Sequence, residues 1–332
     1  MNKSITKSYK LLVFLRKFKC DREKIQLGHD LVISKATNEE INRVKPFTEQ
    51  YPTGISEYIL KKEPYTLDIS GDKSLPPDNV ILDLDWRDKL EVRAEFEDVI
   101  TSLRLFKDNE AFGGGIFAAI PLDKDDLSTI GLPPLLPISF RIAPSLYELR
   151  GLEIDEFKTF WRKRRKSLSN IRKSGDRTFG FLKIALRRYN LSYERGHPED
   201  RFLDYMISFE ALYGRESETT EITHRISTRF ARILGRKYKE EYEKYEKYSE
   251  EKRGKEGRDK KRRGGLRDEM KEFYRVRSKV VHGGEFRPKR FSLEKVKEYL
   301  RKSILIFIES AESGYEHGQL LEYVDLYGFP HS

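Results

Sequence analysis

Cysteine is nearly absent from this sequence of 332 residues, which contains a single thiol at Cys20. One cysteine cannot form an intramolecular disulfide, and it leaves a zinc site without thiolate ligands to draw on. Long hydrophobic runs are also missing, because stretches such as residues 11–15 fall far short of the roughly 20 residues that cross a bilayer. No signal-peptide pattern opens the sequence. We therefore expect a soluble cytoplasmic protein with no membrane partner.

Several catalytic motifs are missing as well. The sequence has no phosphate-binding loop ending in Gly-Lys-Ser/Thr, no paired histidines at helical spacing and no Gly-x-Ser-x-Gly turn. Residues 113–118 formally match a Gly-x-Gly-x-x-Ala pattern, but Pro121 prevents a helix from starting there. We therefore expect neither a cofactor nor a bound metal. A weaker, metal-dependent alternative uses four N-terminal carboxylates as magnesium ligands: Asp83, Asp85, Glu95 and Glu97.

Charge is distributed unevenly along the chain. The sequence has 65 Lys and Arg against 55 Asp and Glu, a net charge of +10. Residues 162–188 hold eleven basic residues and one acidic residue, and residues 236–263 hold thirteen basic and eight acidic residues. Concentrated positive charge favours a polyanionic partner, because Lys and Arg displace the counterions that condense on phosphates. Solvated helix faces and a surface loop explain the same segments without a partner, and composition leaves both interpretations open.

The first 150 residues predict a mixed α/β domain. Three short runs have the composition of strands: residues 10–18, 66–69 and 80–84. Residues 87–106 have the composition of a helix. Residues 112–144 combine glycine, proline and apolar residues without a regular period, so we expect a long packed loop with short strands there.

Helical patterns dominate the rest of the chain. Residues 151–176 predict a basic helical connector, residues 177–315 a bundle of antiparallel helices, and residues 316–332 a C-terminal tail. The helices of the bundle are expected at residues 177–193, 200–213, 222–235, 266–281 and 292–310. The predicted fold class is therefore α+β, with a mixed α/β domain for recognition or sensing followed by an all-α domain.

A charged insertion at about residues 236–265 interrupts the predicted bundle. Tyr238, Tyr242, Tyr245 and Tyr248 are spaced so that they share one face of a helix. Aromatic rings beside cations could stack on unpaired bases, and they could equally pack against a neighbouring helix.

An arginine and a histidine stand close together in Arg277-Ser278-Lys279-Val280-Val281-His282, before a Gly-Gly pair that ends a helix. The spacing alone is not specific, because Arg22 and His29 stand at a similar separation. Specificity comes from three blocks: DYMISFEALY at residues 204–213, ISTRFA at 226–231 and FYRVRSKVVHG at 273–283. In this order, on successive predicted helices, the blocks resemble the HEPN superfamily and, within it, the Apea-like branch.

The resemblance covers about residues 177–312, and the charged insertion departs from the family pattern. It implies a metal-independent endoribonuclease that works as a homodimer, with the motif helices of two protomers facing each other. Arg277 and His282 match the family's catalytic pair, and Ser278 matches the polar position after the arginine. Glu210 and Arg229 match recurrent family positions, and we expect them to form a buried pair that sets helix register. A role in antiviral defence or stress, with a trigger bound by the N-terminal domain, follows by analogy.

The chemistry of these side chains suits the implied roles. The planar guanidinium of Arg277 matches phosphate oxygens, and His282 could exchange a proton with a ribose 2′-OH or a leaving 5′-oxygen. Residues five apart on a helix point about 140° from each other, so a shared site requires a two-fold interface. Six further cations are expected to bind RNA: Lys279, Arg275, Arg162, Arg164, Arg165 and Lys166. The alternative is a HEPN module that binds RNA, a nucleotide or a protein without cleaving it.

Overall fold

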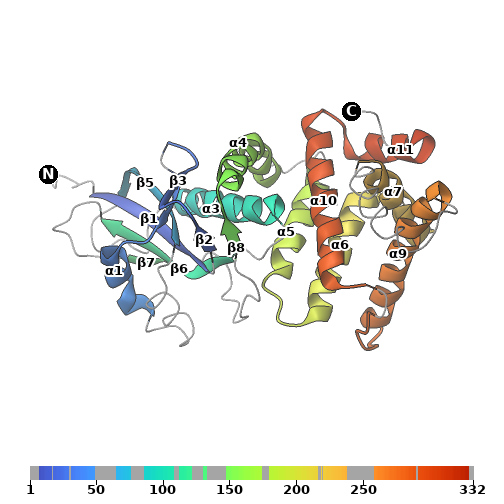
Figure 1. The fold of residues 1–332 in the computed structure, drawn as a ribbon, viewed down its shortest axis with the longest axis horizontal. Helices are drawn as coiled ribbons and strands as arrows, with labels where there is room; N and C mark the ends of the chain where they lie inside the picture. Colours follow the sequence, from blue (N-terminus) through green and yellow to red (C-terminus); the bar gives the residue numbers. More distant parts are fainter. Residues whose placement is uncertain are drawn as a thin grey trace. The chain divides into compact units, whose positions relative to one another are not determined.

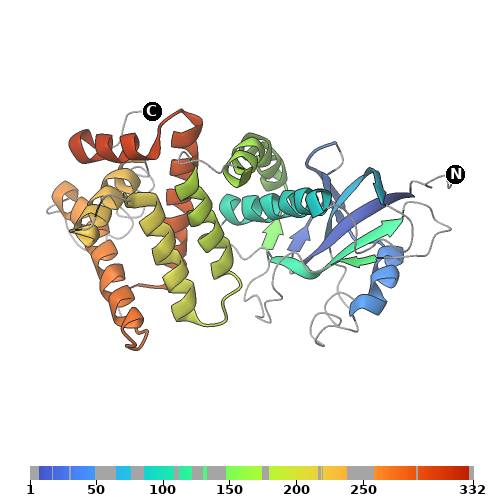
Figure 2. The same cartoon turned by 180° about the vertical axis from the view of Figure 1, so that it is seen from behind.

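A computed structural model describes thirteen stretches of the chain and divides it into two units, residues 1–169 and 170–332. Figures 1 and 2 show the two units from opposite sides. The described residues are mostly helical with a smaller sheet region, which fits the predicted α+β class. The described stretches are residues 7–16, 18–29, 31–48, 65–75, 86–107, 112–121, 130–132, 147–173, 179–215, 218, 220–237, 258–288 and 291–328.

An antiparallel sheet of order β3-β4-β5-β1-β6-β7 is the centre of the first unit. Its central strand β1 pairs with β5 on one side and β6 on the other, so that Leu11 lies opposite both Ile69 and Ala119. A separate parallel pair joins β2 to β8. The strands are β1 (Lys7–Arg16), β2 (Phe18–Cys20), β3 (Lys24–Gln26), β4 (Leu31–Lys35), β5 (Tyr65–Leu75), β6 (Phe112–Pro121), β7 (Ile130–Leu132) and β8 (Tyr147–Leu149).

Three helices accompany the sheet: α1 (Asn38–Thr48), α3 (Trp86–Phe106) and α4 (Leu152–Lys173). Figure 1 shows α3 and α4 side by side, and both contribute fully buried residues to one core, such as Phe96 and Trp161. The Tyr147 hydroxyl donates to the Leu103 carbonyl at 2.8 Å, and the Trp161 indole N–H donates to the Leu27 carbonyl at 3.2 Å. Helix α4 is therefore part of the first unit over most of its length, and it occupies most of the segment predicted as a basic helical connector at residues 151–176.

The second unit consists of helices in its described residues. Figure 2 shows α5, α6 and α10 running alongside one another. Aromatic rings fill the space between α6, α7 and α10: Phe230 meets both Phe209 and Tyr213 edge-on, and the Tyr213 hydroxyl donates to Ser303 Oγ at 2.7 Å. The helices are α5 (Gly180–Ser192), α6 (Pro198–Tyr213), α7 (Ile222–Lys237), α9 (Arg258–Val281), α10 (Leu293–Glu312) and α11 (His317–Tyr327).

Local signals explain several helix ends. Pro198 stands in the first turn of α6, where its missing N–H has no intrahelical partner to lose. Ser292 caps α10, because its hydroxyl accepts a hydrogen bond from the Lys295 N–H at 3.2 Å. Gly214 follows α6 in extended conformation, and a Cβ there would lie 2.7 Å from the Glu210 carbonyl oxygen. The helix therefore ends where the sequence predicted it.

The structure departs from the sequence-based prediction in the glycine-rich segment. Residues 113–115 lie in the ten-residue strand β6, where a long packed loop with only short strands was predicted. The pairing of β1 with β6 shifts register between Val13 and Leu15, opposite this glycine run. Glycine tolerates such a bulge because it has no side chain to place. The predicted strand at residues 80–84 lies outside the described residues.

The observed bounds of other elements also differ from the predicted ones. Helix α9 begins at Arg258, inside the segment predicted as an insertion, and α7 continues through Gly235 to Lys237. The segment predicted as a tail contains α11, whose Leu320, Leu321 and Val324 are buried. The helix α11 is therefore part of the second unit, which extends to the end of the chain.

Candidate functional site

The candidate site lies at the C-terminal end of α9, the helix that carries Arg277, Ser278 and His282. One face of α9 is anchored in the second unit by Met270, Phe273 and Val276, all buried. The Phe273 ring meets the Phe291 ring edge-on at a centroid distance of 4.6 Å. Buried residues at this spacing fix the rotation of the helix, and they therefore determine which way the remaining side chains point.

A glycine pair stops the helix immediately after His282. The Gly284 N–H donates to the Lys279 carbonyl at 2.8 Å and the Gly283 N–H donates to the Val280 carbonyl at 3.1 Å, the two bonds of a Schellman motif. Gly283 has a φ of 79°, in the left-handed region that disfavours side chains. A Cβ on Gly284 would lie 2.9 Å from the Lys279 carbonyl oxygen. Both glycines are thus required by the backbone, and His282 occupies the C-cap position.

Arg277 is held by a carboxylate from a neighbouring helix. Its Nη2 lies 3.4 Å from Oε1 of Glu210 on α6, and the two side chains are 35% and 30% exposed. Tyr274 lies one turn before Arg277 on α9 and is 8% exposed. The Tyr274 hydroxyl has no hydrogen bond of normal geometry among the described residues. Together Glu210, Tyr274 and Arg277 form a half-buried polar group between α6 and α9.

Burial changes the protonation of this group. Burial raises the pKa of Glu210, and the nearby Arg277 and the Tyr274 hydroxyl oppose that rise because they favour the carboxylate. The pKa of Tyr274 is raised, first by burial and then by the charge of Glu210, so the phenol stays protonated. The hydroxyl therefore remains a donor next to the Glu210 carboxylate.

Ser278 and His282 are exposed, and among the described residues no hydrogen bond or ion pair joins His282 to Arg277. Across the described residues, the His282 side chain has no hydrogen-bond or ion-pair partner. Its backbone N–H donates to the Ser278 carbonyl at 3.2 Å, so it continues the turn of α9. On a regular helix, residues five apart point about 140° from each other.

The two cations beside the motif differ in their surroundings. Arg275 is exposed and forms a two-point ion pair with Glu272 on its own helix, at 2.8 and 2.5 Å, which raises its pKa. Lys279 is exposed and has no partner among the described residues. Of these two candidate RNA-binding residues, only Lys279 offers an unengaged charge.

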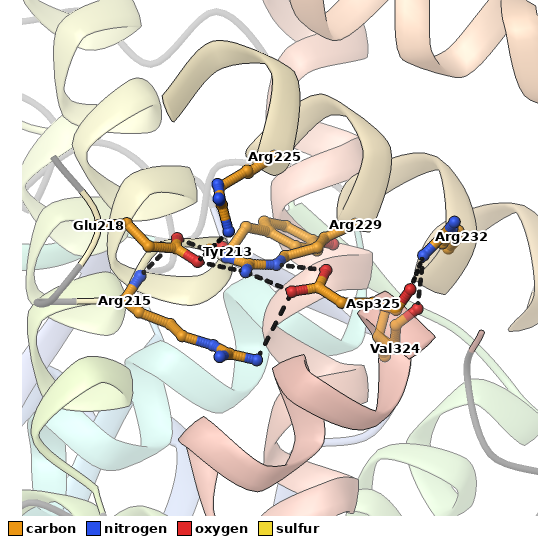
Figure 3. Close-up of polar contacts among 8 residues, drawn as sticks. All are labelled: Tyr213, Arg215, Glu218, Arg225, Arg229, Arg232, Val324 and Asp325. Atoms are coloured by element: carbon orange, nitrogen blue, oxygen red, sulfur yellow. Dashed lines mark hydrogen bonds and ion pairs between the residues drawn. The ribbon is translucent and has the colours of Figure 1, made fainter. Parts of the chain in front are cut away.

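The predicted pairing of Glu210 with Arg229 is wrong, because each residue has other partners. Arg229 on α7 is completely buried, and its guanidinium donates to Glu218, to Asp325 and to the Tyr213 carbonyl (Figure 3). The two carboxylates lie 2.5 to 2.9 Å from its nitrogens. Arg229 thus joins α7 to α11 through Asp325 and to the end of α6 through the Tyr213 carbonyl, but not through Glu210.

Arg232 strengthens the same junction. One of its terminal nitrogens, Nη1, donates to the carbonyls of Val324 and Asp325, at 2.8 and 2.7 Å, in the last turn of α11 (Figure 3). The last carbonyls of a helix lack the usual backbone donors, so an arginine that reaches them caps the helix. The Val324 carbonyl also accepts from the Gly328 N–H at 3.1 Å, so Arg232 adds a second donor there.

The cations of α4 that were predicted to bind RNA separate into two groups. Arg164 is 3% exposed and its guanidinium lies over the Phe160 ring at 5.9 Å, so it does not face solvent. This burial argues against the predicted role of Arg164 in RNA binding. Arg165 is exposed but forms an ion pair with Glu95 at 2.5 Å. Arg162 and Lys166 are exposed on the outer side of the helix.

The weaker metal hypothesis gains no support from the described residues. Asp83 and Asp85 lie outside them, and Glu95 is engaged by Arg165. No group of three His, Cys, Asp or Glu side chains within the described stretches is arranged to hold a metal ion.

The four tyrosines at residues 238–248, predicted to share one helix face, also lie outside the described residues. In the part of the chain that is described, no helix is long and apolar enough to cross a membrane.

Sequence reasoning missed Tyr274 and misassigned the partner of Glu210. The spacing of Tyr274 and Arg277 by three residues would have placed both on one side of α9. Glu210 lies on another helix, α6. Whether it faces Tyr274 and Arg277 depends on how α6 packs against α9, and residue spacing within one helix does not reveal this packing.

Comparisons with models of protein families, with curated proteins and with solved structures find no match to this chain.

Proposed function

We propose that this protein is a metal-independent endoribonuclease of the HEPN type, active as a homodimer. The observation that carries the proposal is the end of α9, where a half-buried Arg277 is held by Glu210 and an exposed His282 follows at the helix terminus. The three sequence blocks that resemble the family fall on α6, α7 and α9, which share the aromatic core of one unit.

Arg277 would stabilise charge on the reacting phosphate. A guanidinium stays protonated and presents parallel N–H donors that fit two phosphate oxygens. Glu210 occupies one nitrogen at 3.4 Å and orients the group, while the exposed part of the side chain leaves other donors available. As negative charge builds on the pentavalent phosphorus, these donors stabilise the transition state more than the ground state.

His282 would move the protons. In the proposed reaction the ribose 2′-oxygen attacks the adjacent phosphorus as its proton leaves, a bond forms between that oxygen and phosphorus, and the bond from phosphorus to the 5′-oxygen breaks. The leaving 5′-oxygen takes up a proton. Histidine titrates near neutrality, so one imidazole can accept the first proton and another can supply the second. The products are a 2′,3′-cyclic phosphate and a 5′-hydroxyl.

A second copy of the chain would complete the site. Helix geometry places Arg277 and His282 of one chain about 140° apart, and two α9 termini facing across a two-fold axis would bring an arginine and a histidine from different protomers together. Val281, beside His282, is half exposed and offers an apolar contact for such an interface. Lys279 would add positive charge to the groove between the protomers, which favours RNA.

We further propose a cytoplasmic location and a role in defence or stress, in which the first unit recognises a trigger. The location rests on the near absence of cysteine, because secreted proteins more often carry cysteines paired in disulfides. The role rests on the family resemblance alone.

The test is incubation of the purified full chain with labelled single-stranded RNA in EDTA, with product ends identified. We expect cleavage that yields 2′,3′-cyclic phosphate ends, does not occur on the DNA analogue, and falls at least 100-fold in Arg277→Ala and in His282→Ala. Two matched controls should retain activity: Lys271→Ala, an exposed cation on α9, and His197→Ala, an exposed histidine before α6. Equal activity in all four variants would reject the assignment.

The alternative is a HEPN module that binds RNA, a nucleotide or a protein without cleaving it. The lack of a hydrogen bond or ion pair between Arg277 and His282 among the described residues favours it, because a binding module needs no composite site. Under this alternative the same experiment gives salt-sensitive RNA binding and no product with any variant.

A further inference from the structure

The outward face of α4 carries a row of cations that the α9 site does not use. At 100° per residue, Arg162, Lys163, Lys166 and Lys173 fall within about 100° of arc on the helix surface. All four side chains are exposed, and the row extends along about 16 Å of helix. The carboxylates of this face lie before the row, in the first two turns. We call these four residues the α4 basic face.

The cations of the α4 basic face are not neutralised by the protein. None of the four has an ion-pair or hydrogen-bond partner among the described residues. The neighbouring cations of the same helix do have carboxylate partners: Lys158 lies 3.6 Å from Asp155, and Arg165 lies 2.5 Å from Glu95. Lys158 and Arg165, at the flank of the helix, thus form ion pairs, while the four cations of the α4 basic face form none among the described residues.

The opposite face of α4 makes this surface rigid. Ile154, Phe157 and Trp161 are fully buried, and Leu168 and Ile171 continue the buried stripe toward the end of the helix. Because the backbone is held by this packing, binding at the outer face would not have to order the helix first, and only side-chain freedom would be lost.

Neither helix stability nor a membrane explains the row. Arg162 and Lys166 are like charges at i,i+4, a spacing at which they repel each other and destabilise a helix. A helix that lies on a membrane surface exposes large apolar side chains beside its cations. Among the described residues of α4, the one strongly exposed large apolar side chain is Leu152, which lies in the first turn, before the row.

We infer that the α4 basic face binds the phosphate backbone of a nucleic acid strand, as a surface separate from the α9 site. Open cations at several positions along one rigid line suit a strand with regularly spaced phosphates, and each contact releases counterions. The face presents few groups that could read base edges, so the contact would position a strand without selecting its sequence. The inference stands whether or not the α9 site cleaves RNA.

The test measures binding as a function of salt in the full-length His282→Ala protein, so that cleavage cannot consume the probe. The probes are a fluorescent single-stranded RNA, a DNA of the same length, and vesicles with or without phosphatidylserine. The α4 variant, Arg162→Gln/Lys163→Gln/Lys166→Gln, removes three of the four cations of the α4 basic face. The control variant, Lys19→Gln/Lys24→Gln/Arg150→Gln, removes three exposed cations elsewhere in the same unit. Thermal melts check that both variants are folded.

Log affinity falls as log salt rises, and we expect the α4 variant to make this slope shallower by about 2 for RNA and for DNA. Each lost contact to a single strand accounts for about 0.7 of the slope. The control variant should leave the slope near that of the parent. Equal slopes in the α4 variant and the control variant would overturn the inference. A loss of binding by the α4 variant that is confined to the phosphatidylserine vesicles would also overturn it. The absence of RNA products in the cleavage assay would count against the proposed activity and leave this result unaffected.

Discussion

Glu210 is a carboxylate in surroundings that oppose its charge. Burial raises its pKa, while Arg277 at 3.4 Å favours the ionised form, so the two effects act in opposite directions on the same group. A partly exposed ion pair of this kind contributes little to stability. Its importance would lie in the direction that it gives the guanidinium of Arg277.

The substitution Glu210→Gln separates orientation from stability. Glutamine keeps the shape and can still accept a hydrogen bond, so the free energy of unfolding should change by less than about 1 kcal/mol. RNA cleavage should fall by roughly tenfold or more, because Arg277 loses the charged partner that orients it. Urea unfolding and single-turnover cleavage measure the two quantities. A large loss of stability with unchanged cleavage would show that the pair is structural.

His317 is the clearest pH-sensitive residue among the described residues. Its ring stacks on Phe181 at 3.9 Å, and Nε2 lies 2.8 Å from the Leu212 carbonyl, to which a neutral ring protonated at Nε2 donates. Burial lowers its pKa, and the positive charges of Arg229 and Arg215 add to this effect, while the bond to Leu212 and the charge of Glu218 oppose it.

Stability should therefore fall in mild acid. Because the folded pKa lies below the unfolded value of about 6.5, the unfolded chain binds the proton first as the pH drops. The stabilisation is complete above pH 6.5 and is lost as the pH falls through the folded pKa. Urea unfolding of the wild type and of His317→Phe, which keeps the stacking, measures this at pH 7.5 and pH 5.5. The wild type should lose more stability than the variant over that interval, and equal losses would contradict the assignment.

At the scale of secondary-structure elements, α11 is held to the second unit by a few specific contacts. Leu320, Leu321 and Val324 provide apolar burial, Arg229 binds Asp325, and Arg232 caps the last turn. A short helix gains little stability from its own hydrogen bonds. Its order therefore depends on these contacts with α7.

Arg229→Met should loosen α11. Removing the guanidinium leaves Glu218 and Asp325 close together without their cation, which destabilises a buried site by about 3 kcal/mol. Hydrogen exchange at the amides of α11 should accelerate together with this loss. Arg225→Met is the matched control, because Arg225 is more exposed and contacts Glu218 at 3.4 Å. If the two variants were equally stable, the role given to Arg229 would be wrong.

At the scale of the whole molecule, the proposed activity depends on association of two chains. If Arg277 and His282 act across a two-fold axis, the active species is the dimer, and its fraction falls with dilution by mass action. Below the dimer dissociation constant, activity per chain should decline in proportion to concentration, as measured by cleavage over a dilution series alongside sedimentation. Activity per chain that stays constant while the protein becomes monomeric would exclude a composite site.

Apart from α11, the helices of the second unit were predictable from sequence because their apolar residues recur with helical period and several of their ends carry strong signals. Proline opens α6, Ser292 caps α10, and the Gly283-Gly284 pair ends α9. The capping box of Thr37 and Glu40, which predicts the start of α1, is equally visible but was overlooked. The strand β6 was not predictable from its composition, because glycine disfavours strands unless the neighbouring strand requires a bulge.

The sequence by itself determined most helical segments of the second unit, the angle of about 140° expected between Arg277 and His282, and the concentration of charge in residues 162–188. These properties follow from the backbone period and from composition, which are local. The tertiary structure decided that Glu210 reaches Arg277 while Arg229 reaches Asp325, and that Arg164 is buried while Arg162 is exposed. Those outcomes depend on which face of each helix its neighbours cover, and packing between distant segments sets that face.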